Sequence, residues 1–194
     1  MIRVEVLEGA ALDAVLDDLA RLRIAVFRDF PYLYEGDMAY ERKYVQVYRD
    51  SADAIVVAAY DGQRMVGAST GLPLEDHEDD FGAPLATHNI AEETVFYCAE
   101  SVLLPEYRGH GLGHAFFDRR EEKARALGRS HAMFCSVVRP EEHPARPADY
   151  RHLGPFWRKR GYTPLDGAVV TFDWKDIGDA EQSAKLLQVW IRAL

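Results

Sequence analysis

The sequence feature that most restricts the fold is a run of three alternating glycines, Gly109, Gly111 and Gly113, just past the middle of the chain. The run, RGHGLG, follows the mostly apolar stretch TVFYCAESVLL and precedes a strongly helical stretch. Because glycine weakens helices and favours loops, it predicts a turn from a strand into a helix. The first N–H groups of a helix lack partners within it and lie at the positive end of its dipole. A turn without side chains therefore predicts a phosphate-binding site, to which Arg108 adds positive charge.

Comparison with known phosphate-binding motifs excludes two common classes of phosphate-binding site. A P-loop needs Lys-Ser/Thr after its last glycine, which is absent here, and in the dinucleotide motif Gly-x-Gly-x-x-Gly the third glycine would come one residue later. The pattern that fits is Arg-x-x-Gly-x-Gly at residues 108–113. A turn that needs small residues only for packing would require one glycine rather than three. His110 and His114 are four residues apart, but a zinc site would need further ligands, so we expect no metal.

The rest of the chain predicts an α/β protein. Asp61-Gly62 suits a tight turn between two hairpin strands, and Asp37 is the predicted N-cap of a helix. Hairpins combined with one strand–helix–strand unit favour a mixed sheet, and the absence of repeats and linkers favours one domain over residues 1–194. We expect strands at residues 2–7, 54–60, 63–74, 94–104, 131–138, 168–174 and 185–191, and helices at residues 11–28, at 37–49, from the glycine turn to about 127, and within 147–162 ending near Gly161.

This order of elements, with Arg-x-x-Gly-x-Gly between strand and helix and PFWRKRGY near the end, resembles the GNAT superfamily of acetyl-CoA-dependent N-acetyltransferases. The resemblance covers the chain from the first strand to PFWRKRGY. It implies a mixed, mostly antiparallel central sheet flanked by helices, and direct acetyl transfer in a ternary complex. It also implies that backbone amides of the glycine turn bind the pyrophosphate of coenzyme A. The residues it assigns to acetyl-CoA are Val102, Leu103, Leu104, Arg108, Gly109, His110, Gly111, Leu112, Gly113, His114, Phe156 and Trp157.

Two residues are candidates for the chemistry. Glu100 interrupts an apolar strand, and the resemblance implies a general base there; the alternatives are that it pairs with an arginine or points to solvent. The resemblance also implies a backbone N–H donor to the thioester oxygen near Leu103 and Leu104. Many family members carry a tyrosine as general acid where this chain has Trp157. Tyr150 is our candidate acid. The alternatives are Tyr162, His152, water, no acid at all, or a packing role for Tyr150.

Residues that bind the acceptor are expected in the aromatic loop after the first helix, where Phe30, Tyr32 and Tyr34 lie. Aromatic faces suit an apolar or cationic acceptor, although they also suit core packing. We therefore expect a small-molecule primary amine as acceptor. A protein N-terminus or lysine is the enzymatic alternative, and a catalytically silent acyl-CoA sensor is the non-enzymatic one.

Composition bears on partners and location. A formal charge of -9 argues against nucleic-acid binding. The longest run of apolar and aromatic residues, 54–60, is too short to cross a membrane, and the first residues do not resemble a signal peptide. Cys98 and Cys135 lie in apolar runs, as reduced core thiols do. These features predict a cytoplasmic protein, for which a homodimer is compatible with the sequence.

Overall fold

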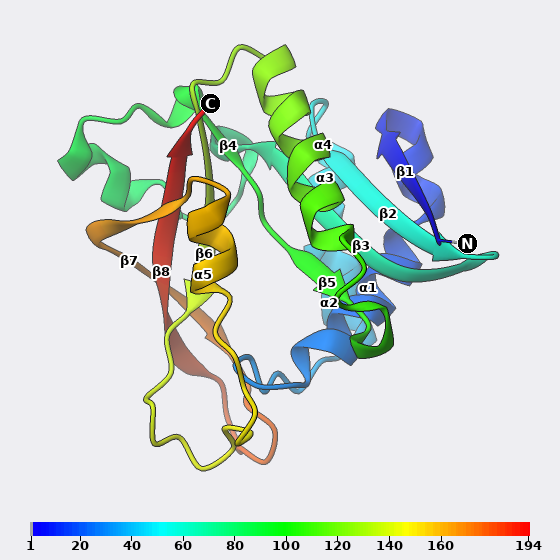
Figure 1. Ribbon diagram of the computed structural model, residues 1–194, viewed down its shortest axis with the longest axis vertical. Helices are drawn as coiled ribbons and strands as arrows, with labels where there is room; N and C mark the ends of the chain where they lie inside the picture. Colours follow the sequence, from blue (N-terminus) through cyan, green and yellow to red (C-terminus); the bar gives the residue numbers. More distant parts are fainter. Residues whose placement is uncertain (1) are drawn as a thin grey trace.

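The computed structural model describes residues 2–194, and its centre is one mixed sheet (Figure 1). The strands lie in the order β1-β2-β3-β4-β6-β8-β7, and β5 pairs with β3. Among the paired strands only β4 and β6 run parallel, so the predicted mixed and mostly antiparallel sheet is confirmed. The strands are β1 (Ile2–Glu8), β2 (Ile55–Asp61), β3 (Arg64–Pro73), β4 (Val95–Tyr97), β5 (Ser101–Leu103), β6 (His131–Val137), β7 (Thr163–Trp174) and β8 (Ser183–Ala193).

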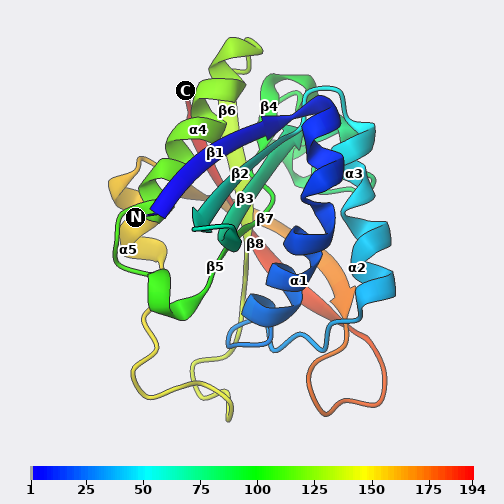
Figure 2. The same cartoon turned by 90° about the vertical axis from the view of Figure 1, so that its right-hand side faces the viewer.

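Helices cover both faces of this sheet (Figure 2). The helices α1 (Leu16–Phe27), α2 (Met38–Tyr44) and α3 (Gln46–Asp50) lie on one face, and α4 (Leu112–Ala126) and α5 (Gly154–Lys159) lie on the other. Successive side chains of a strand point to opposite faces. In β2 the even-numbered Val56 and Ala58 accordingly join the core under α1, whereas Ile55 and Val57 join the core under α4.

Several predicted elements differ from the observed ones in their bounds. The first predicted helix begins as a 3₁₀ helix, Gly9–Ala14, and the second divides into α2 and α3. Asp37 is the N-cap of α2, as predicted, because its Oδ1 accepts the N–H of Tyr40 at 2.9 Å. The helix expected within 147–162 is shorter and begins only at Gly154, while the last two strands are longer than expected.

The predicted strand at 94–104 is interrupted, and this interruption positions the site. Cys98 N–H donates to Met133 O at 2.7 Å, which extends the pairing of β4 with β6 by one residue. After that residue the chain leaves β6, and β5 pairs only with β3, while the second half of β6 pairs only with β8. Figure 1 shows β5 and β6 diverging after β4. The sheet therefore has an opening between β5 and β6, next to Glu100.

Candidate active site

The glycine turn lies between β5 and α4 and has a backbone that requires glycine at two positions. Gly109 and Gly111 have φ values of 82° and 81°, in the left-handed region that side chains disfavour. No atom lies within 4 Å of a Cβ built at either position, so conformation, and not crowding, explains these two glycines. At Gly113 a Cβ would lie 3.4 Å from Cζ of Phe156, an ordinary contact. Packing alone therefore does not account for this run.

The backbone amides of this turn are free to bind a ligand. The first helical bonds of α4 run from the N–H groups of His114 and Ala115 to Gly111 O, at 3.0 and 3.3 Å. Within residues 2–194, the N–H groups of residues 109–113 make no hydrogen bond. Arg108 Nε donates to Leu103 O at 3.2 Å, so its guanidinium lies beside the end of β5. Free amides, a helix N-terminus and one arginine fit a pyrophosphate group.

The edge of β5 that faces the opening offers two further donors. Leu104 N–H donates to Val66 O, and Glu100 O accepts from Thr70 N–H, both at 3.0 Å. Alternate residues of an antiparallel strand face opposite edges, so the N–H groups of Ser101 and Leu103 point away from β3, into the opening. Of the two residues expected near the thioester oxygen, Leu103 has a free backbone donor, whereas the Leu104 amide is used within the sheet. Ser101 is a second donor that the sequence did not indicate.

The two aromatic residues of α5 have different surroundings. The Phe156 ring packs at 4.9 Å from His114 of the glycine turn, measured between ring centroids. Trp157 is half-buried and packs against the core, with its ring centroid 4.9 Å from that of Phe134 and 5.0 Å from that of Trp190. Phe156 therefore lies beside the proposed phosphate site, and Trp157 supports it from behind.

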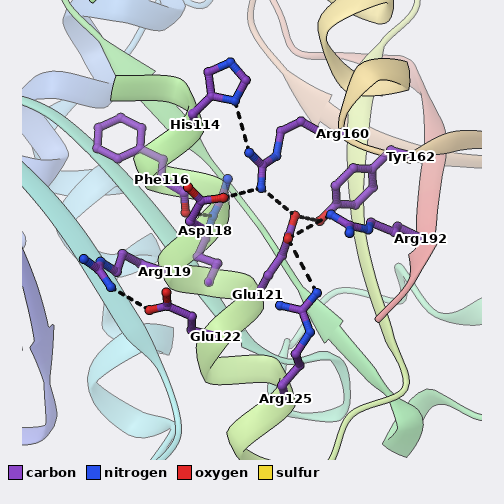
Figure 3. Close-up of polar contacts among 11 residues, drawn as sticks. His114, Phe116, Asp118, Arg119, Glu121, Glu122, Arg125, Arg160, Tyr162 and Arg192 are labelled. Atoms are coloured by element: carbon purple, nitrogen blue, oxygen red, sulfur yellow. Dashed lines mark hydrogen bonds and ion pairs between the residues drawn. The ribbon is translucent and has the colours of Figure 1, made fainter. Parts of the chain in front are cut away.

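A buried ionic network fixes α5 against α4 (Figure 3). Arg160, at the end of α5, contacts His114 Nδ1 at 3.1 Å, Asp118 Oδ1 at 2.6 Å and Glu121 Oε1 at 3.2 Å. Glu121 also accepts from the Tyr162 hydroxyl at 3.1 Å. Tyr162 is fully buried and donates to a carboxylate on the core side of α4, so it does not reach the opening. This removes one of the alternatives for the general acid.

A cavity of about 70 Å³ lies where the strands diverge. Ala99 and Glu100, from the interrupted strand, and Cys135, from β6, form part of its wall. Nine of its lining side chains are aromatic, and Tyr32 and Tyr34 of the predicted acceptor loop are among them. Phe30, the third predicted residue, is not; its ring packs against Tyr150 at 4.7 Å and His143 at 5.7 Å. The structure thus brings Tyr32, Tyr34 and Glu100 together, and it leaves Phe30 and Tyr150 as a separate pair.

Glu100, which lines this cavity, is held by four hydrogen bonds to three residues. Its Oε1 accepts from Arg23, and its Oε2 accepts from the Thr70 hydroxyl and, at 2.5 Å, from the Tyr48 hydroxyl. The backbone N–H of Glu100 donates to Thr70 Oγ1 at 3.1 Å. Arg23 also pairs with Glu41, a fully buried carboxylate. The alternative in which Glu100 pairs with an arginine is therefore what the structure shows, and Glu100 also lines the cavity, so the general-base role stays a prediction.

Arg23 is a residue of the site that the sequence reading missed. It is 6% exposed and lies on α1 among Leu16, Leu19, Ala20 and Phe27, all of which are buried. These positions follow the i, i+3, i+4 and i+7 spacing of one helix face. A single arginine within an otherwise apolar helix face was the signal that could have identified it.

The tyrosines around Glu100 are uncharged at neutral pH. Burial, followed by the negative charge of Glu100, holds the pKa of Tyr44 and Tyr48 well above its usual range. Burial is also the main reason that the pKa values of Tyr32 and Tyr34 are raised. Among the residues that line the cavity, Arg23 is the basic side chain and Glu100 the acidic one.

His77 lies behind the aromatic wall and predicts a pH-dependent stability. Its side chain is 1% exposed, its Nε2 has no partner within residues 2–194, and Asp79 Oδ2 lies 3.8 Å from its Nδ1. Burial lowers the pKa of His77 below the usual 6.5, although Asp79 opposes this. Below about pH 6.5 the unfolded chain then binds more protons than the folded protein. The free energy of unfolding is therefore highest above this pH and decreases as the pH falls below it.

Urea unfolding over this pH range measures the effect. His77→Phe, which keeps an aromatic ring but cannot titrate, is expected to reduce the loss of stability on acidification. An identical pH dependence in both proteins would show that His77 is not its source.

Other chemical features are limited. Within residues 2–194 no group of three or more His, Cys, Asp and Glu side chains could hold a metal ion. Both cysteines, Cys98 and Cys135, are buried and free. In the same part of the chain, no helix combines the length and the apolar character needed to span a membrane.

Comparisons with known proteins agree with this geometry. Residues 17–154 match the family described as "Acetyltransferase (GNAT) family". A search of curated proteins found no match. Three solved structures share the fold: PaiA N-acetyltransferase from Thermoplasma acidophilum in complex with coenzyme A (11% identity, TM-score 0.57, 100% of this chain and 99% of that one), ribosomal-protein-alanine N-acetyltransferase from Brucella melitensis (12%, 0.61, 98% and 99%), and polyamine N-acetyltransferase from Drosophila melanogaster (13%, 0.59, 100% of both).

Proposed function

This chain belongs to the GNAT acetyltransferase family, and on that premise we propose that it transfers an acetyl group from acetyl-CoA to a primary amine of a small molecule, by direct transfer in a ternary complex. The free amides of residues 109–113, with Arg108, would bind the pyrophosphate. The unpaired edge of β5 and the Phe156 ring would line the path from there to Glu100.

The observation on which this proposal depends is the position of the aromatic cavity. It adjoins the opening between β5 and β6 through Ala99, Glu100 and Cys135, so an acceptor in the cavity would meet the thioester there. Side chains from α1, α2, β6, β7 and β8 line it. A cavity surrounded in this way suits a small molecule better than an extended peptide, which needs an open groove.

The lining also indicates the chemical class of the acceptor. Aromatic faces attract cations as well as apolar groups. Near the Glu100 end of the cavity two acidic side chains, Glu100 and Glu41, share the single guanidinium of Arg23. We therefore propose an acceptor that carries its amine on an aromatic or apolar body and enters as an ammonium ion.

The reaction requires that this ammonium lose a proton. A free alkyl amine has a pKa of about 10.4, so it is mostly protonated at neutral pH. We propose that Glu100 accepts the proton, directly or through water. The neutral amine nitrogen then bonds to the acetyl carbon and the carbon–sulfur bond breaks. The departing thiolate takes up a proton, and the nitrogen loses its second proton, which passes through water to the group that protonated the thiolate, so that the one proton released overall is the one that Glu100 accepts. Tyr150 stays our candidate from the sequence for the donor of the thiolate's proton, although it packs with Phe30 outside the cavity lining; burial raises its pKa, which keeps its hydroxyl protonated.

The proposal is tested by incubating the protein with acetyl-CoA and a panel of amines and by measuring the release of free CoA thiol. Aryl-alkyl and alkyl amines should be acetylated, and mass shifts should appear on these amines and not on peptides. Acetylation of peptides alone would favour the protein acetyltransferase. Binding of acetyl-CoA without turnover of any amine would favour the sensor.

Two aromatic residues of one loop provide a matched test of the acceptor site. Tyr32→Leu is expected to raise the KM for the amine roughly tenfold, because a group that contributes about 1.4 kcal/mol of binding is lost. Phe30→Leu, outside the cavity lining, should leave this KM unchanged. Steady-state kinetics with saturating acetyl-CoA measures both, and equal KM values for the two variants would contradict the assignment of Tyr32.

A further inference from the structure

Arg120 is a buried cation without an anionic partner. It lies in the middle of α4 and is 1% exposed. Within residues 2–194 no carboxylate lies within ion-pair distance of its guanidinium. Burying a guanidinium costs free energy unless its donors are satisfied. An apolar side chain would fill the same space beside Phe117 without this cost, so packing alone does not explain an arginine here.

The donors of Arg120 converge on the interruption between β4 and β5. Nη1 donates to Glu100 O at 3.0 Å and to Thr70 O at 3.2 Å, and Nη2 donates to Ser101 Oγ at 2.9 Å. Nε donates to Phe116 O of the same helix at 3.2 Å. The guanidinium thus joins α4 to the peptide unit between Glu100 and Ser101.

That peptide unit has opposite groups on its two sides. In a trans peptide the C=O and N–H point in opposite directions. Glu100 C=O points towards Thr70 and Arg120, so Ser101 N–H points into the opening between β5 and β6. A cation that binds the carbonyl draws electron density from the amide and makes the N–H a stronger donor, because hydrogen bonds in a chain polarise one another.

We propose that Arg120 is a positioning residue that holds and polarises the Glu100–Ser101 peptide, so that Ser101 N–H binds the thioester oxygen. This inference rests on the proposed function. The negative charge that develops on that oxygen during acetyl transfer is stabilised by a donor that is already aimed and that has a fixed positive charge behind it. The helix α4 also links the two parts of the site, because it begins at the glycine turn and contacts the Glu100–Ser101 peptide through Arg120.

The first test is spectroscopic and needs no acceptor. A hydrogen bond to a carbonyl lowers its stretching frequency, which infrared difference spectroscopy with acetyl-CoA labelled at the carbonyl carbon can measure. In Arg120→Met the carbonyl band of bound acetyl-CoA is expected at a higher frequency than in the wild-type protein. Arg119→Met is the matched control, since Arg119 lies one residue earlier on α4, is exposed and pairs with Glu122; it should retain the wild-type frequency. An unchanged band in Arg120→Met with bound acetyl-CoA would overturn the proposal.

The second test separates positioning from a structural role. Arg120→Met is expected to lower kcat about tenfold, less than the 10²–10³ that follows complete loss of such a donor, with little change in KM for either substrate. In Arg120→Ala, millimolar guanidinium should restore part of kcat, and it should have no effect on Arg119→Ala. If Arg120→Met fails to fold, Arg120→Lys, which keeps the charge but loses the planar fork, should show an intermediate band and rate. Equal losses in acetyl-CoA affinity and kcat, without rescue, would indicate a structural role only.

These outcomes are distinguishable from failure of the proposed function. If wild-type protein acetylates no amine, the proposed transfer is wrong, but the infrared comparison still reports whether Arg120 acts on a bound thioester. If wild-type protein turns over and the Arg120 variants match it, only the role of Arg120 is wrong.

Discussion

Gly111→Glu is expected to weaken CoA binding at least a hundredfold. The side chain would enter the space in front of α4 that is open in the structure, where no atom lies within 4 Å of the added Cβ. There its carboxylate would repel the pyrophosphate and cover the free amides. Isothermal titration with CoA measures the loss.

Gly111→Ala separates this effect from backbone strain. Both variants force a side chain onto a φ of 81°, at a cost of about 1–2 kcal/mol, so both should lose some stability. Only glutamate adds bulk and charge at the phosphate site. If alanine and glutamate at position 111 gave the same Kd for CoA, the glycine turn would not be the phosphate site.

Glu100→Gln is expected to lower kcat by about 10²–10⁴, the usual contribution of a general base. The amide keeps the size and several hydrogen bonds of the carboxylate but cannot accept the ammonium proton. The pH profile of kcat should change as well, because the group that must be ionised is gone. Rates measured over a range of pH with the best amine of the panel give both quantities.

Glu41→Gln is the matched control for this prediction. Glu41 shares Arg23 with Glu100 and is also buried, but it does not line the cavity. If Glu100→Gln lowered kcat only by removing a negative charge beside Arg23, Glu41→Gln would lower kcat to the same extent. A normal kcat and pH profile in Glu100→Gln would leave that residue with a purely structural role.

The sequence predicted those parts of the fold that depend on local chemistry. The glycine turn, the Asp37 cap and the hairpin turn follow from backbone preferences of single residues. The first two lie where they were expected, whereas the hairpin turn is Gly62-Gln63, one residue later than the predicted Asp61-Gly62. The continuous strand at 94–104 was wrong, because its apolar residues fit a strand equally well with or without a break. At the break, Glu100 O accepts a hydrogen bond from Arg120, twenty residues further along the chain, which is a contact that the local sequence does not reveal.

The candidate site was predictable to a similar degree. The glycine turn and Glu100 have local signals, whereas the cavity depends on which side chains the fold brings together. Tyr32 and Phe30 lie two residues apart in one aromatic loop, yet only Tyr32 lines the cavity. The short helix α5 was predicted too long, since residues 147–153 contain a proline and turns that only the three-dimensional contacts settle.

The two roles proposed for α4 would fix the distance between the phosphate and the acyl group of the donor. From Leu112 at the glycine turn to Arg120 at the strand break, eight residues of a stiff helix rise about 12 Å. The helix thus separates the predicted phosphate site at its N-terminus from the proposed position of the thioester beside Arg120 by this distance. If α4 acts at both ends as proposed, a donor with a shorter tether between phosphate and acyl carbon is expected to bind its phosphate without placing the acyl carbon at the strand break.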